Sequence, residues 1–292
     1  MVPLIGVPGL LFWMAAAGAP EQRAVNYLAQ EVPKWARENQ CYSCHNNGDA
    51  ARALFAAKRA GYPVAPAALA DTLEWLRQPA RWSETHGNPG VSNRTLAEIQ
   101  FAGALLDAAL PDRGPLLAAA GALVRLQEQD GSWRVDAGGI PGAPATYGGA
   151  LATYMARRVL LAAGSTAGAA RATRWLETAP ARSIVDAAAI VLALPGHRDA
   201  IDFLRRAQVA DGGWGEAFDT AVALLALHAA GETGPIARGR AALLRMQQPA
   251  GGWPETTRPP GGVSYAEHIS TTAWALYALV ETGAPLPGSK RQ

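Results

Sequence analysis

The stretch that decides the fold has the sequence QVADGGW and occupies residues 208–214. Two further stretches have the same form, QEQDGSW at residues 127–133 and QQPAGGW at residues 247–253. Each of them follows a charged amphipathic segment and precedes a segment rich in alanine and leucine. Self-similarity of this kind is typical of proteins built from stacked structural repeats. The sequence therefore predicts a repeat protein.

Three more copies keep the pair of segments without the glutamine-to-tryptophan signature. They lie around Tyr27, Trp75 and Trp175, so that six units span about residues 21–283. We expect residues 21–283 to form one domain, with a signal peptide or N-terminal anchor at residues 1–20 and a tail at residues 284–292.

The two segments of a unit differ in their hydrophobic pattern. First segments, such as residues 198–208, place arginines between leucine and isoleucine at helical spacing, which predicts a helix with one wet and one buried face. Second segments, such as residues 220–230, are apolar almost all round, which is typical of an inner layer. An outer ring of amphipathic helices around an inner apolar ring is an all-α fold, the α/α toroid. Six pairs can close such a ring, and an open superhelix is the alternative that the repeats leave open.

The Q-x-x-x-G-x-W units resemble the repeats of squalene-hopene cyclases and of protein prenyltransferase β-subunits, over about residues 115–283. This resemblance implies a toroid in which the loops that enter the inner helices open at one end. The cyclases protonate an alkene with the central aspartate of a D-x-D-D-T-A motif. This chain has Phe218 at the central position and keeps Asp219, which we interpret as a helix cap. Triterpene cyclisation is therefore not expected, because the proton donor of the family is absent.

The two cysteines of the chain belong to the motif CYSCH, which begins at Cys41. This spacing attaches haem c, with Cys41 and Cys44 forming thioethers and His45 ligating the iron. His268 and His86, in loops of the sixth and second units, are the candidates for a second iron ligand. Zinc held by the thiolates and imidazoles is one alternative, and a disulfide or free thiols are another.

An apolar run at residues 3–19 ends in small residues, and we interpret it as a secretory signal or an uncleaved membrane anchor. Export to the periplasm or another compartment outside the cytoplasm agrees with covalent haem attachment. Charged residues make up 17% of the chain and the net charge is +2, which argues against a nucleic-acid-binding surface.

The leading hypothesis is therefore an exported haem-binding redox or sensing protein on an α/α toroid, acting with a redox partner protein. It would meet a membrane only through the N-terminal segment. The first alternative is an isoprenoid-processing enzyme, cyclase- or prenyltransferase-like, that holds an apolar small molecule in the central cavity beside a metal site. The second alternative is a non-catalytic interaction scaffold.

Overall fold

The computed structural model describes residues 18–84, 93–135, 147–256 and 264–283, and every regular element in this part of the chain is helical. Six helix pairs follow one another, with the outer helix first: α2 (Pro20–Asn39) with η1 (Cys44–Ala50) and α3 (Ala51–Arg59), α4 (Ala70–Leu76) with α5 (Arg94–Ala108), α6 (Gly114–Leu126) with α7 (Gly148–Ala163), α8 (Thr166–Thr178) with α9 (Ile184–Ala193), α10 (Arg198–Ala207) with α11 (Ala217–Ala229), and α12 (Gly234–Arg245) with α13 (Tyr265–Thr282). Two short 3₁₀ turns, η2 (Pro66–Ala68) and η3 (Pro79–Glu84), flank α4.

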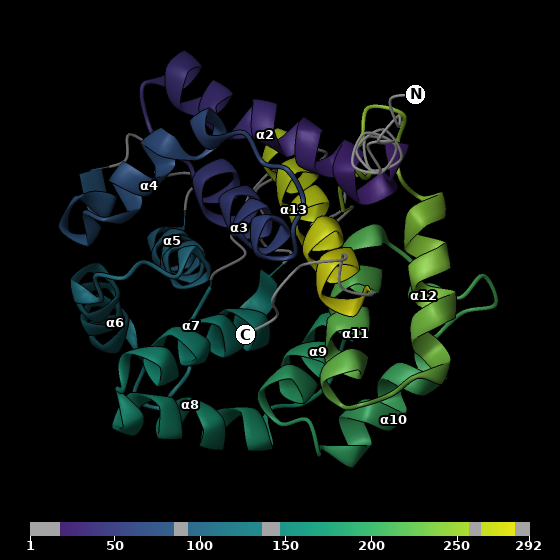
Figure 1. Ribbon diagram of the computed structural model, residues 1–292. Helices are drawn as coiled ribbons and strands as arrows, with labels where there is room; N and C mark the ends of the chain where they lie inside the picture. Colours follow the sequence, from purple (N-terminus) through teal and green to yellow (C-terminus); the bar gives the residue numbers. More distant parts are fainter. Residues whose placement is uncertain (1–17, 85–92, 136–146, 257–263, 284–292) are drawn as a thin grey trace, which may run out of the picture.

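The inner helices close into a ring. Helix α13 packs against α11 on one side and against η1 and α3 on the other, so the sixth unit meets the first. Figure 1 shows this ring from one end, with α2, α4, α6, α8, α10 and α12 outside it. The α/α toroid predicted from the repeats is confirmed, and the open superhelix is excluded.

Burial explains the two layers. In the inner helix α11 every residue from 217 to 227 is buried, because neighbouring helices cover it on all sides. In the outer helix α10 the buried residues are Ala200, Ile201 and Leu204, one stripe of an otherwise charged helix. The hydrophobic patterns therefore place each helix in its ring.

The repeated glutamine and glycine fasten one unit to the next. Nε2 of Gln208 donates to the carbonyls of Gly212, at 2.8 Å, and Pro235, at 2.9 Å, which is in the first turn of α12. Gly212 has φ +91°, and a Cβ there would lie 2.8 Å from the carbonyl oxygen of Arg238. Only glycine allows both this backbone conformation and this approach. The same contacts recur at two other junctions, for Gln127 with Gly168 and for Gln247 with Pro20.

The repeated tryptophan joins the two helices of its own unit. Nε1 of Trp214 donates to the carbonyl of Leu204 on α10, at 2.7 Å, and its backbone N–H donates to Oγ1 of Thr220 on α11, at 3.0 Å. Trp133 and Trp253 make the corresponding bonds. Helix α11 begins at Ala217 with Glu216 at its cap position, so the interpretation of Asp219 as a cap is wrong, and Asp219 lies in the first turn.

No helix within the described ranges is long and apolar enough to cross a membrane. Residues 1–17, which hold most of the predicted signal segment, and the predicted tail at residues 284–292 lie outside those ranges.

Candidate functional site

The C-x-x-C-H motif leads into η1, a π-helix at the end of the barrel where the inner helices begin. Such turns are uncommon and are frequent at functional sites. The side chain of Ser43 caps η1 by accepting a 3.1 Å hydrogen bond from the backbone N–H of Asn46. Nδ2 of Asn46 donates to Oη of Tyr265 on α13, at 2.9 Å, and Nδ2 of Asn47 donates to Oγ1 of Thr72 on α4, also at 2.9 Å. The two asparagines therefore hold the motif between the first, second and sixth units.

The cysteines and the histidine of the motif are all of intermediate exposure as whole residues. Cys41 and Cys44 are free thiols of intermediate exposure. Burial raises the pKa of the Cys44 thiol to about 12, so this thiol is protonated at neutral pH. The ring of His45 lies 4.8 Å from that of Trp35 and 5.7 Å from that of Tyr265, and its buried Nε2 has no hydrogen-bond partner. Burial lowers the pKa of His45 to about 3, which keeps the imidazole neutral.

Of the two predicted second iron ligands the structure describes His268, and its contacts with Glu255 and Tyr27 do not involve His45. The prediction that His268 lies in a loop is wrong, because it lies in the first turn of α13. Its Nδ1 lies 3.3 Å from Oε2 of Glu255, and its ring meets the ring of Tyr27 edge-on at 5.8 Å. His86 falls outside the described residues. In those ranges no group of three or more His, Cys, Asp or Glu side chains could hold a metal ion. A second ligand from either histidine stays a prediction.

One turn beyond His45, η1 places a carboxyl group among the buried side chains at the centre of the ring of inner helices, a region here called the lumen. Gly48 makes this possible, because a Cβ there would lie 2.9 Å from Cβ of Gln100 on α5. Asp49 is fully buried. Its Oδ1 accepts a 2.5 Å hydrogen bond from Oη of Tyr147, and its Oδ2 accepts a 2.7 Å bond from Nε2 of Gln100.

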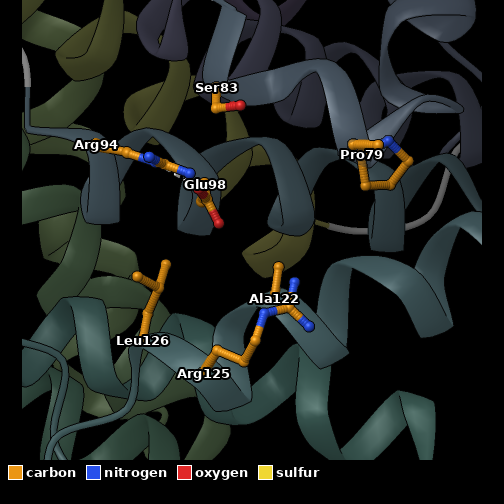
Figure 2. Close-up of a pocket in the computed structure, with 8 residues that line it drawn as sticks. Pro79, Ser83, Arg94, Glu98, Ala122, Arg125 and Leu126 are labelled. Carbon is orange, nitrogen blue, oxygen red and sulfur yellow. Dashed lines mark hydrogen bonds and ion pairs between the residues drawn. The ribbon is translucent and has the colours of Figure 1, made fainter.

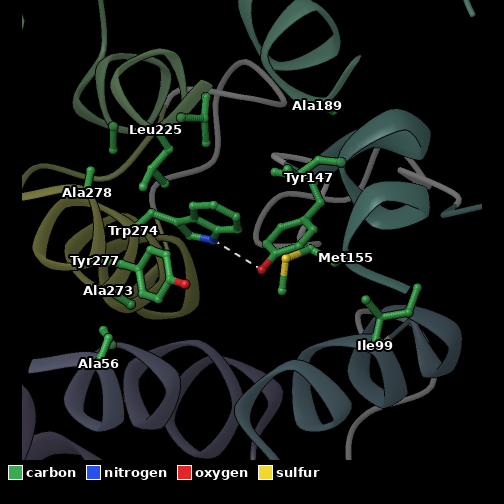
Figure 3. Close-up of a cluster of buried hydrophobic side chains, with 14 of the residues drawn as sticks. Ala56, Ile99, Tyr147, Met155, Ala189, Leu225, Ala273, Trp274, Tyr277 and Ala278 are labelled. Carbon is green, nitrogen blue, oxygen red and sulfur yellow. Dashed lines mark hydrogen bonds between the residues drawn. The ribbon is translucent and has the colours of Figure 1, made fainter. Parts of the chain in front are cut away.

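Asp49 belongs to a set of polar and aromatic side chains from four units. Nε1 of Trp274 donates to Oη of Tyr147 at 3.1 Å, and Figure 3 shows these two rings pointing toward one another across the lumen. The set, here called the lumen cluster, consists of Asp49, Arg52, Gln100, Tyr147, Trp274 and Tyr277.

Arg52 is the cation of the lumen cluster and is 1% exposed. Its guanidinium carbon lies 3.9 Å from the ring centre of Trp274 and 4.5 Å from that of Tyr277. Nη1 contacts Sδ of Met155 at 3.3 Å, whereas Nε and Nη2 have no hydrogen-bond partner. The guanidinium is thus held by aromatic faces rather than by a carboxylate.

Two opposing effects set the pKa of Asp49. Burial is the larger and raises the pKa above its usual range, because the low dielectric disfavours the charged carboxylate. The nearby charge of Arg52 and the bonds from Tyr147, Gln100 and Ser270 lower it by less. Asp49 is therefore a buried carboxyl group with an increased tendency to carry a proton.

Phe218 borders the same cluster. Its ring lies 5.7 Å from that of Trp274 and 6.3 Å from that of Tyr147. The helix position at which the cyclases carry their acid is thus apolar here, while an acid from the first unit enters the lumen nearby.

Two hollows in the wall of the barrel lie away from the lumen cluster. One of about 150 Å³ lies between η3, α5 and α6 and includes the Arg94–Glu98 ion pair (Figure 2). The other, of about 330 Å³, is lined by Leu105, Leu116 and Ala162 among others. The first is smaller than the roughly 300 Å³ at which small-molecule sites begin.

Sequence reasoning missed Asp49, Arg52, Gln100 and Tyr147 as site residues. A signal for two of them exists, because Asp49 and Arg52 interrupt the alanine-rich inner segment of the first unit. Buried charges are rare and mark functional sites more often than exposed ones do.

No protein-family model matches this chain, and no curated protein is significantly similar to it in sequence. Among solved structures, the type II terpene cyclase MstE from Scytonema, in its apo form, superposes with a TM-score of 0.57 at 15% identity, over 90% of this chain and 98% of the cyclase chain. An arginine-to-alanine variant of MstE, in complex with geranylgeranyl dihydroxybenzoate as substrate, gives a TM-score of 0.58 at 14% identity, over 90% and 97% of the two chains. At these identities the likeness concerns the fold alone, and the chain has a terpene cyclase-like α/α toroid.

Proposed function

We propose that this protein is an enzyme that acts on an apolar, isoprenoid-type molecule in the lumen and that Asp49 transfers the proton. The observation that carries the proposal is the buried carboxyl group of Asp49, which burial makes easier to protonate, among the rings of Tyr147, Trp274 and Phe218. An acid surrounded by aromatic faces has the two parts that alkene protonation requires, a proton donor and groups that stabilise positive charge.

The reaction would be an isomerisation or a cyclisation. Protonated Asp49 gives its proton to one carbon of a carbon–carbon double bond, so that the new C–H bond forms and the adjacent carbon becomes cationic. The rings of Trp274 and Phe218 stabilise this cation. Loss of a proton from a neighbouring carbon to the Asp49 carboxylate restores the acid and leaves a product with the mass of the substrate.

Gln100 can serve both protonation states of the acid. Its Nε2 donates to the Asp49 carboxylate, whereas its Oε1 is buried and has no partner. Turning the amide by 180° would present Oε1 to the protonated acid as an acceptor. Tyr147 holds the other carboxyl oxygen in place.

The fold supports this assignment, since a variant of a cyclase with the same architecture forms a complex with a geranylgeranyl substrate. The lumen cluster lies on the inner helices and on the residues directly before them, and all of it is buried, so that a substrate there would be shielded from water. The substrate of this chain itself is part of the proposal.

The test is turnover in D₂O with linear C15 to C30 isoprenoids, followed by mass spectrometry. We expect an isomeric product that carries deuterium, and we expect Asp49→Asn to lower its rate by at least about 10²-fold. Asp199→Asn, the same change at an exposed position of α10, should turn over as the wild type does. Full activity of a folded Asp49→Asn variant, or no isomeric product from any of these substrates, would contradict the proposal.

We also propose haem c at the C-x-x-C-H motif as the second candidate function. The free thiols of Cys41 and Cys44, two residues of intermediate exposure, and the neutral imidazole of His45 favour it. The enclosure of that imidazole does not fit, because the rings of Trp35 and Tyr265 cover it and its Nε2 is buried. Ligation of iron would require the Trp35 side chain to move away.

A pyridine haemochrome assay tests this candidate in protein made by a host that matures c-type cytochromes. Covalent haem in the wild type that is lost in Cys44→Ala would support it, and a colourless wild type would exclude it. The predicted export and redox partner follow from haem attachment and would lose their support with it. Metal analysis of a colourless protein would test the zinc alternative.

A further inference from the structure

Arg52 stands apart from the other arginines near the lumen. Arg158 on α7 lies 3.6 Å from Oδ1 of Asp107, and Nη2 of Arg59 on α3 lies 3.1 Å from the same oxygen. Arg52 is more deeply buried than either, yet no carboxylate contacts its guanidinium in the described residues. A buried guanidinium is ordinarily paired, because taking its charge out of water is costly.

The carboxyl group of Asp49, which influences Arg52 electrostatically, already accepts hydrogen bonds from other residues. Its two oxygens accept from Tyr147 and Gln100, and its electrostatic effect on Arg52 acts without a hydrogen bond between them. Asp49 therefore influences Arg52 electrostatically but does not provide its Nε and Nη2 with a hydrogen-bond partner.

The two unpartnered nitrogens of Arg52 have a specific relation to one another. Nε and Nη2 lie on the same edge of the guanidinium plane, and their N–H bonds run parallel. This edge is the one that takes two oxygens of a carboxylate or a phosphate in a two-point contact. The remaining nitrogen, Nη1, contacts Sδ of Met155.

Neighbouring side chains fix the direction of this edge. The rings of Trp274 and Tyr277 lie against the guanidinium at 3.9 and 4.5 Å, which restrains its plane. Met155 can adapt to an added group, because its side chain is unbranched and flexible. Arg52 is therefore preorganised for a planar anion.

We infer that the Nε/Nη2 edge of Arg52 binds the carboxylate of an apolar monocarboxylic acid. This inference rests on the proposed function and names the class of its substrate. One guanidinium edge matches one carboxylate, whereas a diphosphate brings several charges into a lumen whose second arginine, Arg158, is already paired with Asp107. The buried aromatic and aliphatic side chains around the lumen cluster match the apolar part of such a molecule.

Binding of a carboxylate would also act on the proposed acid. The charge of Arg52 is the largest influence that opposes the rise in the pKa of Asp49. Neutralising that charge with the ligand would raise the pKa of Asp49 further and favour its protonated form. Occupation of the site and readiness of the acid would thus be coupled.

The test is an equilibrium titration, by tryptophan fluorescence and calorimetry, with farnesoic acid, farnesol and farnesyl diphosphate as probes. We expect the wild type to bind the acid at least tenfold more tightly than the alcohol, and the diphosphate no more tightly than the acid. Arg52→Gln should lose this preference, and Arg52→Lys should regain only part of it, because an ammonium group lacks the fork. Arg59→Gln, on the same helix and half-exposed, should keep the preference.

Equal binding of acid and alcohol by the wild type would overturn the inference without requiring any variant to fold. Tighter binding of the diphosphate, or an unchanged preference in Arg52→Gln, would overturn it as well. Binding of the acid without turnover in D₂O would reject the proposed reaction and leave the inference standing. Turnover of the alcohol with no preference for the acid would reject the inference on Arg52 and leave the proposed reaction standing. Failure of all three probes to bind would reject the reaction and the inference together.

Discussion

The phenol of Tyr147 donates a 2.5 Å hydrogen bond to Oδ1 of Asp49 and so joins the third unit to the first across the lumen. The same oxygen of Tyr147 accepts from Nε1 of Trp274 in the sixth unit. Three units that lie far apart in the sequence thus meet on one hydroxyl group. This group has no apolar substitute, because both of its partners are buried.

Tyr147→Phe should lower the free energy of unfolding by about 1–3 kcal/mol, since it leaves a buried acceptor and a buried donor without partners. Urea-induced unfolding measures the change. Tyr154→Phe makes the same replacement at a half-buried position of α7 and should cost less than about 0.5 kcal/mol. Equal losses in the two variants would mean that the Tyr147 hydroxyl does not stabilise the lumen.

The ring could be predicted from the sequence because its junctions are local and repeated. Each glutamine and glycine of the repeat contacts the same positions of the next outer helix, and three copies make the pattern visible. The start of α13 was harder to predict. The apolar pattern begins near Ile269, whereas the helix begins at Tyr265 because Ser264 caps it and the polar Glu267 is buried in its first turn.

The lumen cluster could not be predicted, because no spacing in the sequence relates its members. Asp49, Gln100, Tyr147 and Trp274 come from four different units and meet only when the ring has closed. The motif at residues 41–45 is contiguous and can be recognised in the sequence, whereas the residues that surround His45 are distant from it in the sequence. Trp35 and Tyr265, which cover its ring, come from α2 and α13.

Substitutions at two glycines of the same turn, Gly212 and Gly215, distinguish the cost of backbone strain from the cost of steric overlap. Gly215 has φ +85° and open space around it, so Gly215→Ala should cost about 1–2 kcal/mol for the backbone conformation alone. Gly212 has φ +91°, and its added Cβ would also meet the backbone of Arg238 at 2.8 Å, so Gly212→Ala should cost about 3 kcal/mol or more. Denaturant unfolding of both variants measures the two losses of stability. Equal losses would mean that the backbone of Arg238 moves aside at little cost when a Cβ is added to Gly212.

His45 should make the protein sensitive to acid. Its pKa is lowered to about 3 by burial from an ordinary value of 6.5, so between these values the unfolded chain binds a proton that the folded chain does not. Stability from this group is therefore fully present above pH 6.5 and is lost as the pH falls toward 3, by roughly 2–4 kcal/mol. His45→Phe should remove this part of the pH dependence and keep a ring beside Trp35.

The measurement is the difference in unfolding free energy between His45→Phe and the wild type, taken from pH 7.5 down to pH 4. Parallel curves for His45→Phe and the wild type would show that the imidazole of His45 is not buried in solution.

Arg52 should lower the stability of the ligand-free protein. Arg52→Met removes a buried charge and two unpartnered N–H groups, at the cost of its contacts with Trp274 and Tyr277, each worth about 0.5–2 kcal/mol. Replacing buried charges by apolar side chains of similar volume often raises stability by about 1–4 kcal/mol, so we expect a net gain of about 1 kcal/mol in urea unfolding. Arg59→Met, which breaks the ion pair with Asp107, should instead be neutral or destabilising.

A larger loss of stability in Arg52→Met than in Arg59→Met would mean that Arg52 stabilises the barrel itself. A gain in stability together with lost carboxylate binding would show that the chain keeps a destabilising cation for its ligand.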